Sequence, residues 1–293
     1  MSIKNNVGVA LKGFGMGAAN VVPGVSGGTI ALLCGIFGEL IDALNAFITP
    51  STWKTLFRGD FRGFLDKIHG KFLFWLFIGI LLSVFTLAKL VTWTLRLYPV
   101  QTWAFFFGLI AASALCMLRD IRGWQAKDIL FTVAGIALGL LTSTLSPAET
   151  PDSMWFIALC GAIAVCTMIL PGISGSFILV ILGKYDFIMQ AVGSMDIPVI
   201  CVFAAGAVAG ILAFSKFLHW LLARFERQTM LILIGFVIGT LVKVWPWSDM
   251  AAVSAANELT ATPGAMHIPA AIICAVAGAA FVLILELRSG KKA

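Results

Sequence analysis

The sequence predicts an all-α polytopic membrane protein built as an inverted repeat, each half being a re-entrant helical hairpin plus three transmembrane helices. Of its 293 residues 60% are hydrophobic and only 12% charged, and the mean hydropathy is +1.01. Soluble domains carry about 25% charged residues. Six apolar runs approach the ~20 residues that a bilayer crossing requires. Two further apolar regions are interrupted by the same short phrase, which indicates a duplicated, membrane-embedded fold.

The six runs predicted to span the membrane are 72–97, 101–118, 129–146, 197–222, 229–247 and 268–287. The two interrupted regions are 8–48 and 155–192. Their first arms, about residues 8–22 and 155–170, are short for full crossings. Re-entrant hairpins, which enter and leave the membrane on one side, fit these arms better.

The repeated phrase is Pro23-Gly24-Val25-Ser26-Gly27-Gly28 in the first region and Pro171-Gly172-Ile173-Ser174-Gly175-Ser176 in the second, 148 residues later. Such a run cannot continue a helix, because proline lacks the N–H group and glycine loses the most conformational entropy on ordering. Broken backbone at membrane depth survives only where protein or a water-filled cavity satisfies its polar groups. Breaks at matching positions in two halves are the best sequence indication of a transporter's binding site.

The repeat extends beyond the phrase at two offsets. At an offset of 148 the matched residues are Gly13 with Gly161, Ile30 with Ile178, Gly35 with Gly183, and Ala43 with Ala191. At an offset of 127 they include Gly79 with Gly206, Lys89 with Lys216, Trp93 with Trp220, and Gln101 with Gln228. An extra basic loop at 50–71 in the first half accounts for the difference. We therefore predict a first membrane repeat over 1–150 and a second, inverted one over 151–293.

Lysine and arginine are concentrated in the loops 50–71, 119–128 and 223–228 and near the C-terminus, whereas 147–153 and 246–267 contain neither. Since basic loops stay in the cytoplasm, both termini are expected to be cytoplasmic. The net charge of +6 is thus a topology signal and a contact to membrane lipids, and nucleic acid is not an expected partner.

Each break precedes a new apolar helix, so its N–H groups, glycines and hydroxyls could bind a phosphate or carboxylate. The residues predicted to bind it are Pro23, Gly24, Ser26, Gly27, Gly28, Thr29, Pro171, Gly172, Ser174, Gly175 and Ser176. The alternative is that serine and glycine only allow helices to pack closely. Two such motifs in register favour a binding site.

Two lysines, Lys89 and Lys216, lie inside long apolar runs, and they are added to the predicted anion site because a lysine in the membrane is costly and usually functional. The alternative is snorkelling of the amine to the interface. Gln101 and Gln228 begin the next span in each half and, with Asn20, are candidates to line a cavity. The two glutamines could equally cap helices.

Enzyme signatures and metal-ligand spacings are absent from the sequence, so we predict neither an enzyme nor a metal site. No histidine follows or precedes either phrase closely enough to assist a serine nucleophile. Four charged residues that follow the broken regions, Glu39, Asp42, Lys184 and Asp186, are expected to face water.

With N-V-V-P-G-V-S-G-G-T at 20–29 and I-L-P-G-I-S-G-S-F at 169–177, the chain resembles the bacterial and archaeal polyprenyl-phosphate transporter family over nearly its whole length. The resemblance implies a flippase in the cytoplasmic (inner) membrane. It would return undecaprenyl phosphate from the outer to the inner leaflet, where this carrier is reused to build peptidoglycan and other envelope polymers.

A transporter or channel for a small soluble anion would share the breaks and lysines, and a membrane enzyme acting on lipid phosphates is the other alternative. Inward movement of negative charge opposes an inside-negative potential, at about 2.3 kcal/mol per charge per 100 mV. We therefore expect alternating access coupled to a cation, H⁺ or Na⁺, and no other cofactor.

Overall fold

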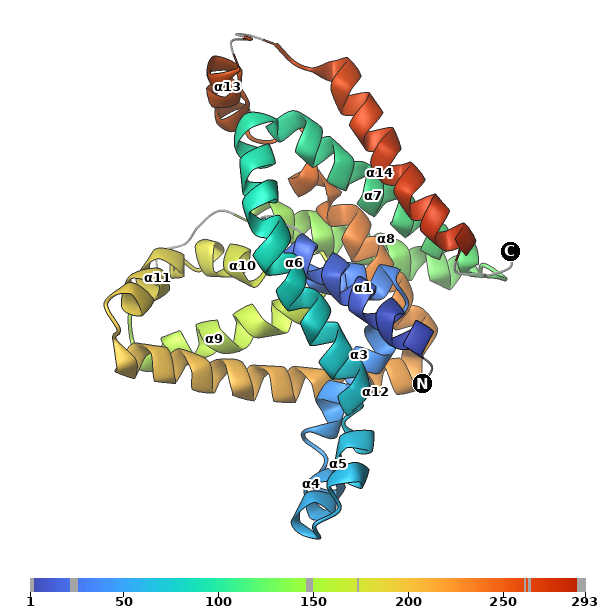
Figure 1. Ribbon diagram of the computed structural model, residues 1–293, viewed down its shortest axis with the longest axis vertical. Coiled ribbons are helices and arrows are strands. Elements are labelled where there is room, and N and C mark those ends of the chain that lie inside the picture. The colour runs from blue at the N-terminus through green and yellow to red at the C-terminus, as the bar shows by residue number, and fades with distance from the viewer. Residues whose placement is uncertain are drawn as a thin grey trace. The chain divides into compact units, whose positions relative to one another are not determined.

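The computed structural model describes residues 3–21, 26–145, 150–172, 174–260, 262 and 265–288. Every regular element in these residues is a helix (Figure 1), which confirms the all-helical prediction for the described part. The chain forms two compact units, one of Met1–Val84 with Leu145–Thr229 and one of Phe85–Thr144 with Met230–Ala293. Each unit therefore combines segments from both predicted repeats, whose boundaries stay a prediction.

The long apolar runs form the long helices, as expected from their composition. They are α6 (Gly70–Leu97), α7 (Pro99–Asp120), α8 (Ala126–Thr144), α12 (Ile197–Thr240) and α14 (Ile268–Arg288). Among the described residues, four helices are long and apolar enough to cross a membrane, or up to six if each bent helix pair counts as one span. The protein is a multi-pass membrane protein.

The predicted spans 197–222 and 229–247 are two helical stretches that meet at a kink, which lies in the predicted turn 223–228. Helix α12 continues to Thr240 and into the 3₁₀ turn η1 (Leu241–Val244), and Phe225 is its non-helical residue (φ −136°, ψ 44°). In the first half, Tyr98 has nearly the same backbone angles (φ −135°, ψ 54°) between α6 and α7. The two aromatic residues are 127 positions apart, so α12 is the counterpart of α6 and α7 joined across a kink.

Each broken region contains three helices instead of the two arms expected. The first has α1 (Ile3–Val21), α2 (Gly27–Leu33) and α3 (Phe37–Ala46), and the second has α9 (Met154–Ile169), α10 (Gly175–Ile181) and α11 (Tyr185–Gly193). Helices α2 and α3 are bent by 117° and α10 and α11 by 111°. The bends contain Gly35 (φ +66°) and Gly183 (φ +62°), which glycine adopts without steric cost.

The helix after each break is too short to cross the bilayer. Helices α2 and α10 have seven residues each, so each is about 10 Å long. The hydrocarbon core is about 30 Å thick. Neither short helix crosses the core by itself, so each bent helix pair is either a broken span or a re-entrant loop.

Two regions expected to be loops contain helices. The basic segment 50–71 forms α4 (Pro50–Phe57) and α5 (Phe61–Lys67), and α13 (Met250–Leu259) lies in 246–267. Their lengths of 7 to 10 residues are too short for a periodic apolar signal to stand out.

Glycines bring the first-unit helices together backbone to backbone. A Cβ atom at Gly13 of α1 would collide with the carbonyl oxygen of Leu76 on α6, and one at Gly79 of α6 would collide with that of Ala10 on α1. Close approach of two helices at small residues replaces the hydrophobic driving force that is missing in lipid.

Helices α9 and α12 repeat this contact residue for residue. A Cβ atom at Gly161 would meet the carbonyl oxygen of Phe203, and one at Gly206 would meet that of Ala158. These residues follow their α1 and α6 counterparts by 148 and 127 positions, the two offsets found in the sequence. Packing in the two halves is thus repeated at the level of individual backbone atoms.

The second unit contains another repeated pair of glycine contacts. Helices α7 and α14 meet through Gly108 against Ala275 and Gly278 against Phe105; α12 and α8 meet through Gly235 against Thr132 and Gly135 against Ile232. The members on α12 again follow those on α7 by 127 positions.

Candidate functional site

The first break is closed by side chains from both of its ends. Ser26, the N-cap residue of α2, accepts a hydrogen bond from the N–H of Gly28 at 3.1 Å. The Oδ1 atom of Asn20, near the end of α1, accepts one from the N–H of Gly27 at 2.8 Å. Protein acceptors therefore already satisfy these N–H groups of the α2 N-terminus.

The two breaks meet inside the first unit, as the phrase repeat suggests. The Ser26 hydroxyl lies 3.2 Å from the carbonyl oxygen of Met168 and 3.1 Å from that of Leu170, within donating distance of both. In the other direction, the N–H of Gly172 donates to Oγ1 of Thr29 at 2.7 Å. Ser26 and Thr29 are 2% and 1% exposed. Buried hydroxyls of the first break therefore hold the two breaks together.

Glycine is required at the centre of this junction. A Cβ atom at Gly28 would collide with the carbonyl oxygen of Ile169 and lie 3.2 Å from that of Met168. Gly175, the matching start of α10, faces the backbone of Ala164 on α9 in the same way. The close packing that the sequence offered as one alternative is thus present at both breaks, and anion binding there stays a prediction.

The second break keeps its hydroxyls away from the junction. Ser174 is the N-cap residue of α10 but makes no side-chain capping bond. Its Oγ atom lies 2.7 Å from Oγ of Ser176, and Ser176 is exposed. The two copies of the phrase therefore differ: buried hydroxyls hold the structure in the first, and an accessible hydroxyl pair remains in the second.

The other residues of the predicted site have different positions. Pro171 and Gly172 are buried at the junction, whereas Pro23 and Gly24 lie outside the described residues. Gln101 is the third residue of α7 and Gln228 follows the α12 kink, both partly buried. Their assignment to a cavity or a cap stays a prediction.

Both lysines of the predicted site lie on exposed helix surfaces. Lys216 is exposed on α12 in the first unit, and Lys89 is exposed on α6 in the second. Each precedes by four residues a tryptophan that is half exposed, Trp93 at 52% and Trp220 at 51%. Lysine and tryptophan at this spacing share one face of a helix.

An aromatic partner that the sequence analysis missed completes each lysine–tryptophan pair. The rings of Trp93 and Tyr98 are 5.9 Å apart at 70°, and those of Trp220 and Phe225 are 5.9 Å apart at 77°. Tyr98 and Phe225 are the two kink residues. A comparison of the two halves at the offset of 127 that accepted any two aromatic residues as a match, instead of identical residues only, would have found them.

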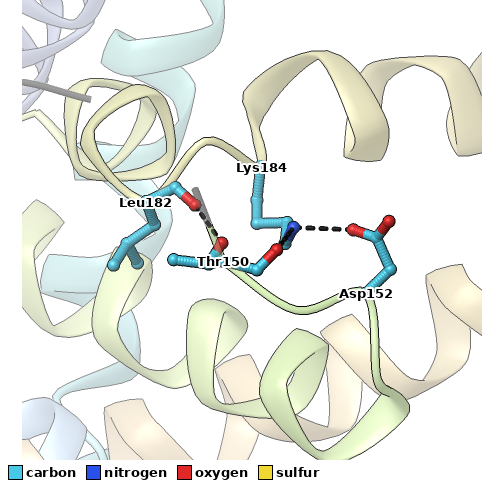
Figure 2. A network of polar contacts seen from close by, with 4 residues as sticks. All are labelled: Thr150, Asp152, Leu182 and Lys184. Carbon is cyan, nitrogen blue, oxygen red and sulfur yellow. Dashed lines mark hydrogen bonds and ion pairs between the residues drawn. The ribbon is translucent and has the colours of Figure 1, made fainter. Parts of the chain in front are cut away.

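Lys184 is buried, so the prediction that it faces water is wrong. Figure 2 shows its amine donating to the carbonyl oxygen of Thr150 and to Asp152, both at 2.6 Å. The Thr150 hydroxyl donates in turn to the carbonyl oxygen of Leu182. The network ties the segment before α9 to the bend between α10 and α11, which no local sequence signal indicates.

The other three residues expected to face water are at least partly exposed. Asp42 lies 2.9 Å from Nδ1 of His219 and Glu39 lies 3.5 Å from Nδ1 of His69. Within the described residues, no group of three histidine, cysteine, aspartate or glutamate side chains could hold a metal ion.

Replacing Asp152 with asparagine is expected to destabilise the second hairpin region, because the buried Lys184 ammonium loses its counter-charge. A hydrogen bond to a charged group contributes about 1.5–3 kcal/mol, and the 66% exposure of the Asp152 side chain places the loss near or below the lower end. Thermal unfolding in detergent micelles measures it. Asp186→Asn, an exposed aspartate on α11, is the control; an equal midpoint for the two variants contradicts the assigned role.

Comparison with known proteins places these features in a family. Residues 16–262 match the family described as undecaprenyl phosphate translocase-like. A protein of Vibrio cholerae named polyprenyl-phosphate transporter is 42% identical over 245 residues, which cover 84% of this chain and 79% of that protein. A Staphylococcus aureus protein of the same name is 31% identical over 256 residues, covering 80% and 85%. No solved structure matches the chain.

The relatives are named as transporters, in agreement with the prediction that the chain is not an enzyme. The family match covers both copies of the phrase, the basic segment and both lysines. The resemblance read from the doubled phrase is confirmed. The chain belongs to the undecaprenyl phosphate translocase-like family.

Proposed function

We propose that this protein transports polyprenyl phosphate, with undecaprenyl phosphate as the substrate, from the outer to the inner leaflet of the cytoplasmic membrane. The observation that carries the proposal is the meeting of the two breaks through Ser26, Thr29 and Gly172, beside a hydroxyl pair that stays accessible. The names of two relatives, which this chain matches over four fifths of its length, supply the substrate.

In this proposal the phosphate head group binds at the second break. Ser174 and Ser176 donate to its oxygens, while Ser26, Thr29 and Asn20 hold the backbone in place. Gly27, Gly28, Pro171 and Gly175 allow the chain to turn and pack there, and Pro23 and Gly24 stay predicted members of the site. The prenyl tail stays in the lipid, because transfer of its hydrocarbon chain into a polar environment would be unfavourable.

Lys89 and Lys216 are proposed to attract the head group from the lipid side. Each lies in the C-terminal part of a helical stretch, before the kink residue Tyr98 or Phe225, and the Cα–Cβ bond of a helical residue tilts toward the helix N-terminus. The tilt directs each lysine away from the nearer interface, so snorkelling works against the geometry. The adjacent Trp93 and Trp220, typical of the membrane interface, mark where a lipid head group would approach.

The inverted repeat is proposed as the basis of alternating access. Recurrence of the glycine contacts and of the aromatic kinks at constant offsets supports a duplication. Halves with an odd number of crossings would then have opposite orientation, placing Lys89 toward the outer leaflet and Lys216 toward the inner one. The basic loops place both termini in the cytoplasm. A coupled cation, H⁺ or Na⁺, would offset the electrical cost of inward transport.

The test uses purified protein in sealed vesicles with fluorescent polyprenyl phosphate in both leaflets, where an impermeant reagent destroys the outer pool. Transport gives protein-dependent loss of the inner pool. Uptake of soluble phosphate instead identifies a small-anion transporter, and release of phosphate from the lipid identifies an enzyme. Either of these results, without movement of the lipid, overturns the proposal.

In the same vesicles, Lys89→Met and Lys216→Met are each expected to slow lipid movement about tenfold, since an interaction with a charged group is worth about 1.5–3 kcal/mol. Methionine keeps the apolar stem, so the yield of folded protein should not change. Lys127→Met, in the first turn of α8, serves as the control. Transport at the control rate in both variants would make the two lysines interfacial anchors.

A further inference from the structure

The α4–α5 hairpin is a feature that the proposed transport does not use. It connects α3 to α6, outside the long apolar helices, and its second helix ends at Lys67, just before α6 begins at Gly70. In Figure 1 it extends from the first unit across the direction of α12, instead of continuing along it. The hairpin therefore projects from the first unit next to the start of α6.

The hairpin is held together by its own polar contacts. The Lys67 amine donates to the carbonyl oxygen of Ser51 at 3.1 Å and to the Thr55 hydroxyl at 2.6 Å, joining α5 to α4. Asp60 caps α5 by accepting from the N–H of Gly63 at 2.8 Å. The hairpin is therefore an ordered element with a defined outer surface.

Large apolar side chains on this surface are exposed although the hairpin is packed. Phe57 is 84% exposed and Phe61 66%, on either side of the turn, and Trp53 and Leu65 continue the same helix faces four residues away, at 40% and 46%. So much aromatic surface at one tip is unfavourable in water. We therefore expect these side chains to be covered by another surface.

Basic residues accompany the apolar ones at a constant spacing. Lys54, Arg58 and Arg62 each directly follow Trp53, Phe57 and Phe61 in sequence, and all three are exposed. Within the described part of the chain, none of these basic side chains forms an ion pair. Apolar and unpaired basic groups side by side on a short helix match the boundary between lipid tails and anionic head groups.

We propose that the α4–α5 hairpin docks on the anionic phospholipid surface beside α6, with the Phe57 and Phe61 rings at the head-group boundary and Arg58 and Arg62 on lipid phosphates. The hairpin is short enough to stay near the head groups, because an eight-residue helix spans about 12 Å and α5 ends at the start of a membrane helix. Lys67, which joins the two helices of the hairpin, is not among the docking residues.

The test places an environment-sensitive dye on Phe57→Cys in full-length protein whose six native cysteines are replaced, in nanodiscs of phosphatidylcholine with or without phosphatidylglycerol. The dye is expected to shift to the blue, to resist an aqueous quencher and to be quenched by a nitroxide at the lipid head group. Asp66→Cys, exposed on another face of α5, is the matched control and should stay open to the aqueous quencher.

The charge requirement is tested with Arg58→Gln and Arg62→Gln in the labelled protein. Each should lower the ratio of docked to undocked hairpin about fivefold in phosphatidylglycerol discs, as about 1 kcal/mol per basic residue predicts. Equal quenching at positions 57 and 66 overturns the proposal. So does protection that depends on protein concentration, which indicates a second copy, or on added cytosol, which indicates a protein partner. Transport of the lipid is measured separately, so its failure does not affect this result.

Discussion

Replacing Gly28 with alanine is expected to separate the two helix breaks and abolish transport. The added methyl group would collide with the carbonyl oxygen of Ile169 and crowd that of Met168. Both obstacles are backbone atoms, which cannot rotate away as a side chain can. Overpacking of this kind costs about 1–3 kcal/mol, and the displaced hairpin would also stretch the hydrogen bonds of Ser26. Yield of monodisperse protein and the midpoint of thermal unfolding should both fall.

Gly38→Ala provides the matched control for this substitution. Gly38 is also a helical glycine of the first broken region, but nothing lies within 4 Å of the position of its Cβ atom. Alanine there should be neutral or stabilising by up to about 1 kcal/mol, because it favours the helix. If Gly28→Ala unfolds and transports like Gly38→Ala, the close approach of the two hairpins does not exist.

The double substitution Ser174→Ala with Ser176→Ala is expected to reduce lipid transport strongly while the protein stays folded. These hydroxyls bond to one another, and among the described residues they hold no backbone group of the junction. The loss of each hydrogen bond to a charged phosphate should lower the transport rate about tenfold or more. The measurements are the rate in sealed vesicles and the unfolding midpoint of the same preparation.

Ser26→Ala should behave in the opposite way. It removes the α2 cap and the contacts to Met168 and Leu170 from a site that is 2% exposed, so its main effect should be on the unfolding midpoint. Rescue by Ser26→Thr, which keeps the hydroxyl, supports a positioning role. A double alanine variant of the second break that transports at the wild-type rate removes Ser174 and Ser176 from the site.

The sequence was informative where the membrane itself restricts the chain. Apolar length predicted α6, α7, α8 and α14 to within a few residues, and Pro-Gly placed both breaks. It also placed the division of α12, because the kink residue Phe225 lies in the predicted turn 223–228. It failed in 50–71, where the basic residues suggested a loop and the seven- and eight-residue helices were too short to detect.

The candidate site was predictable in position but not in detail. Ser26 and Ser174 occupy equal places in the repeated phrase, yet one is a buried structural residue and the other is accessible. That difference arises from contacts between residues more than 140 positions apart, which no local pattern encodes. The same holds for Lys184, whose partner Asp152 lies 32 residues before it.

The hydrogen bonds that join the breaks restrict how this protein can move. Any motion that preserves the Ser26 and Thr29 contacts must carry both breaks as one body. In the proposed alternating access, the junction would then be a pivot rather than a gate. Opening toward one leaflet or the other would then come from swinging of the long helices about their aromatic kinks at Tyr98 and Phe225. The head group would stay at the fixed point while access to it changes sides.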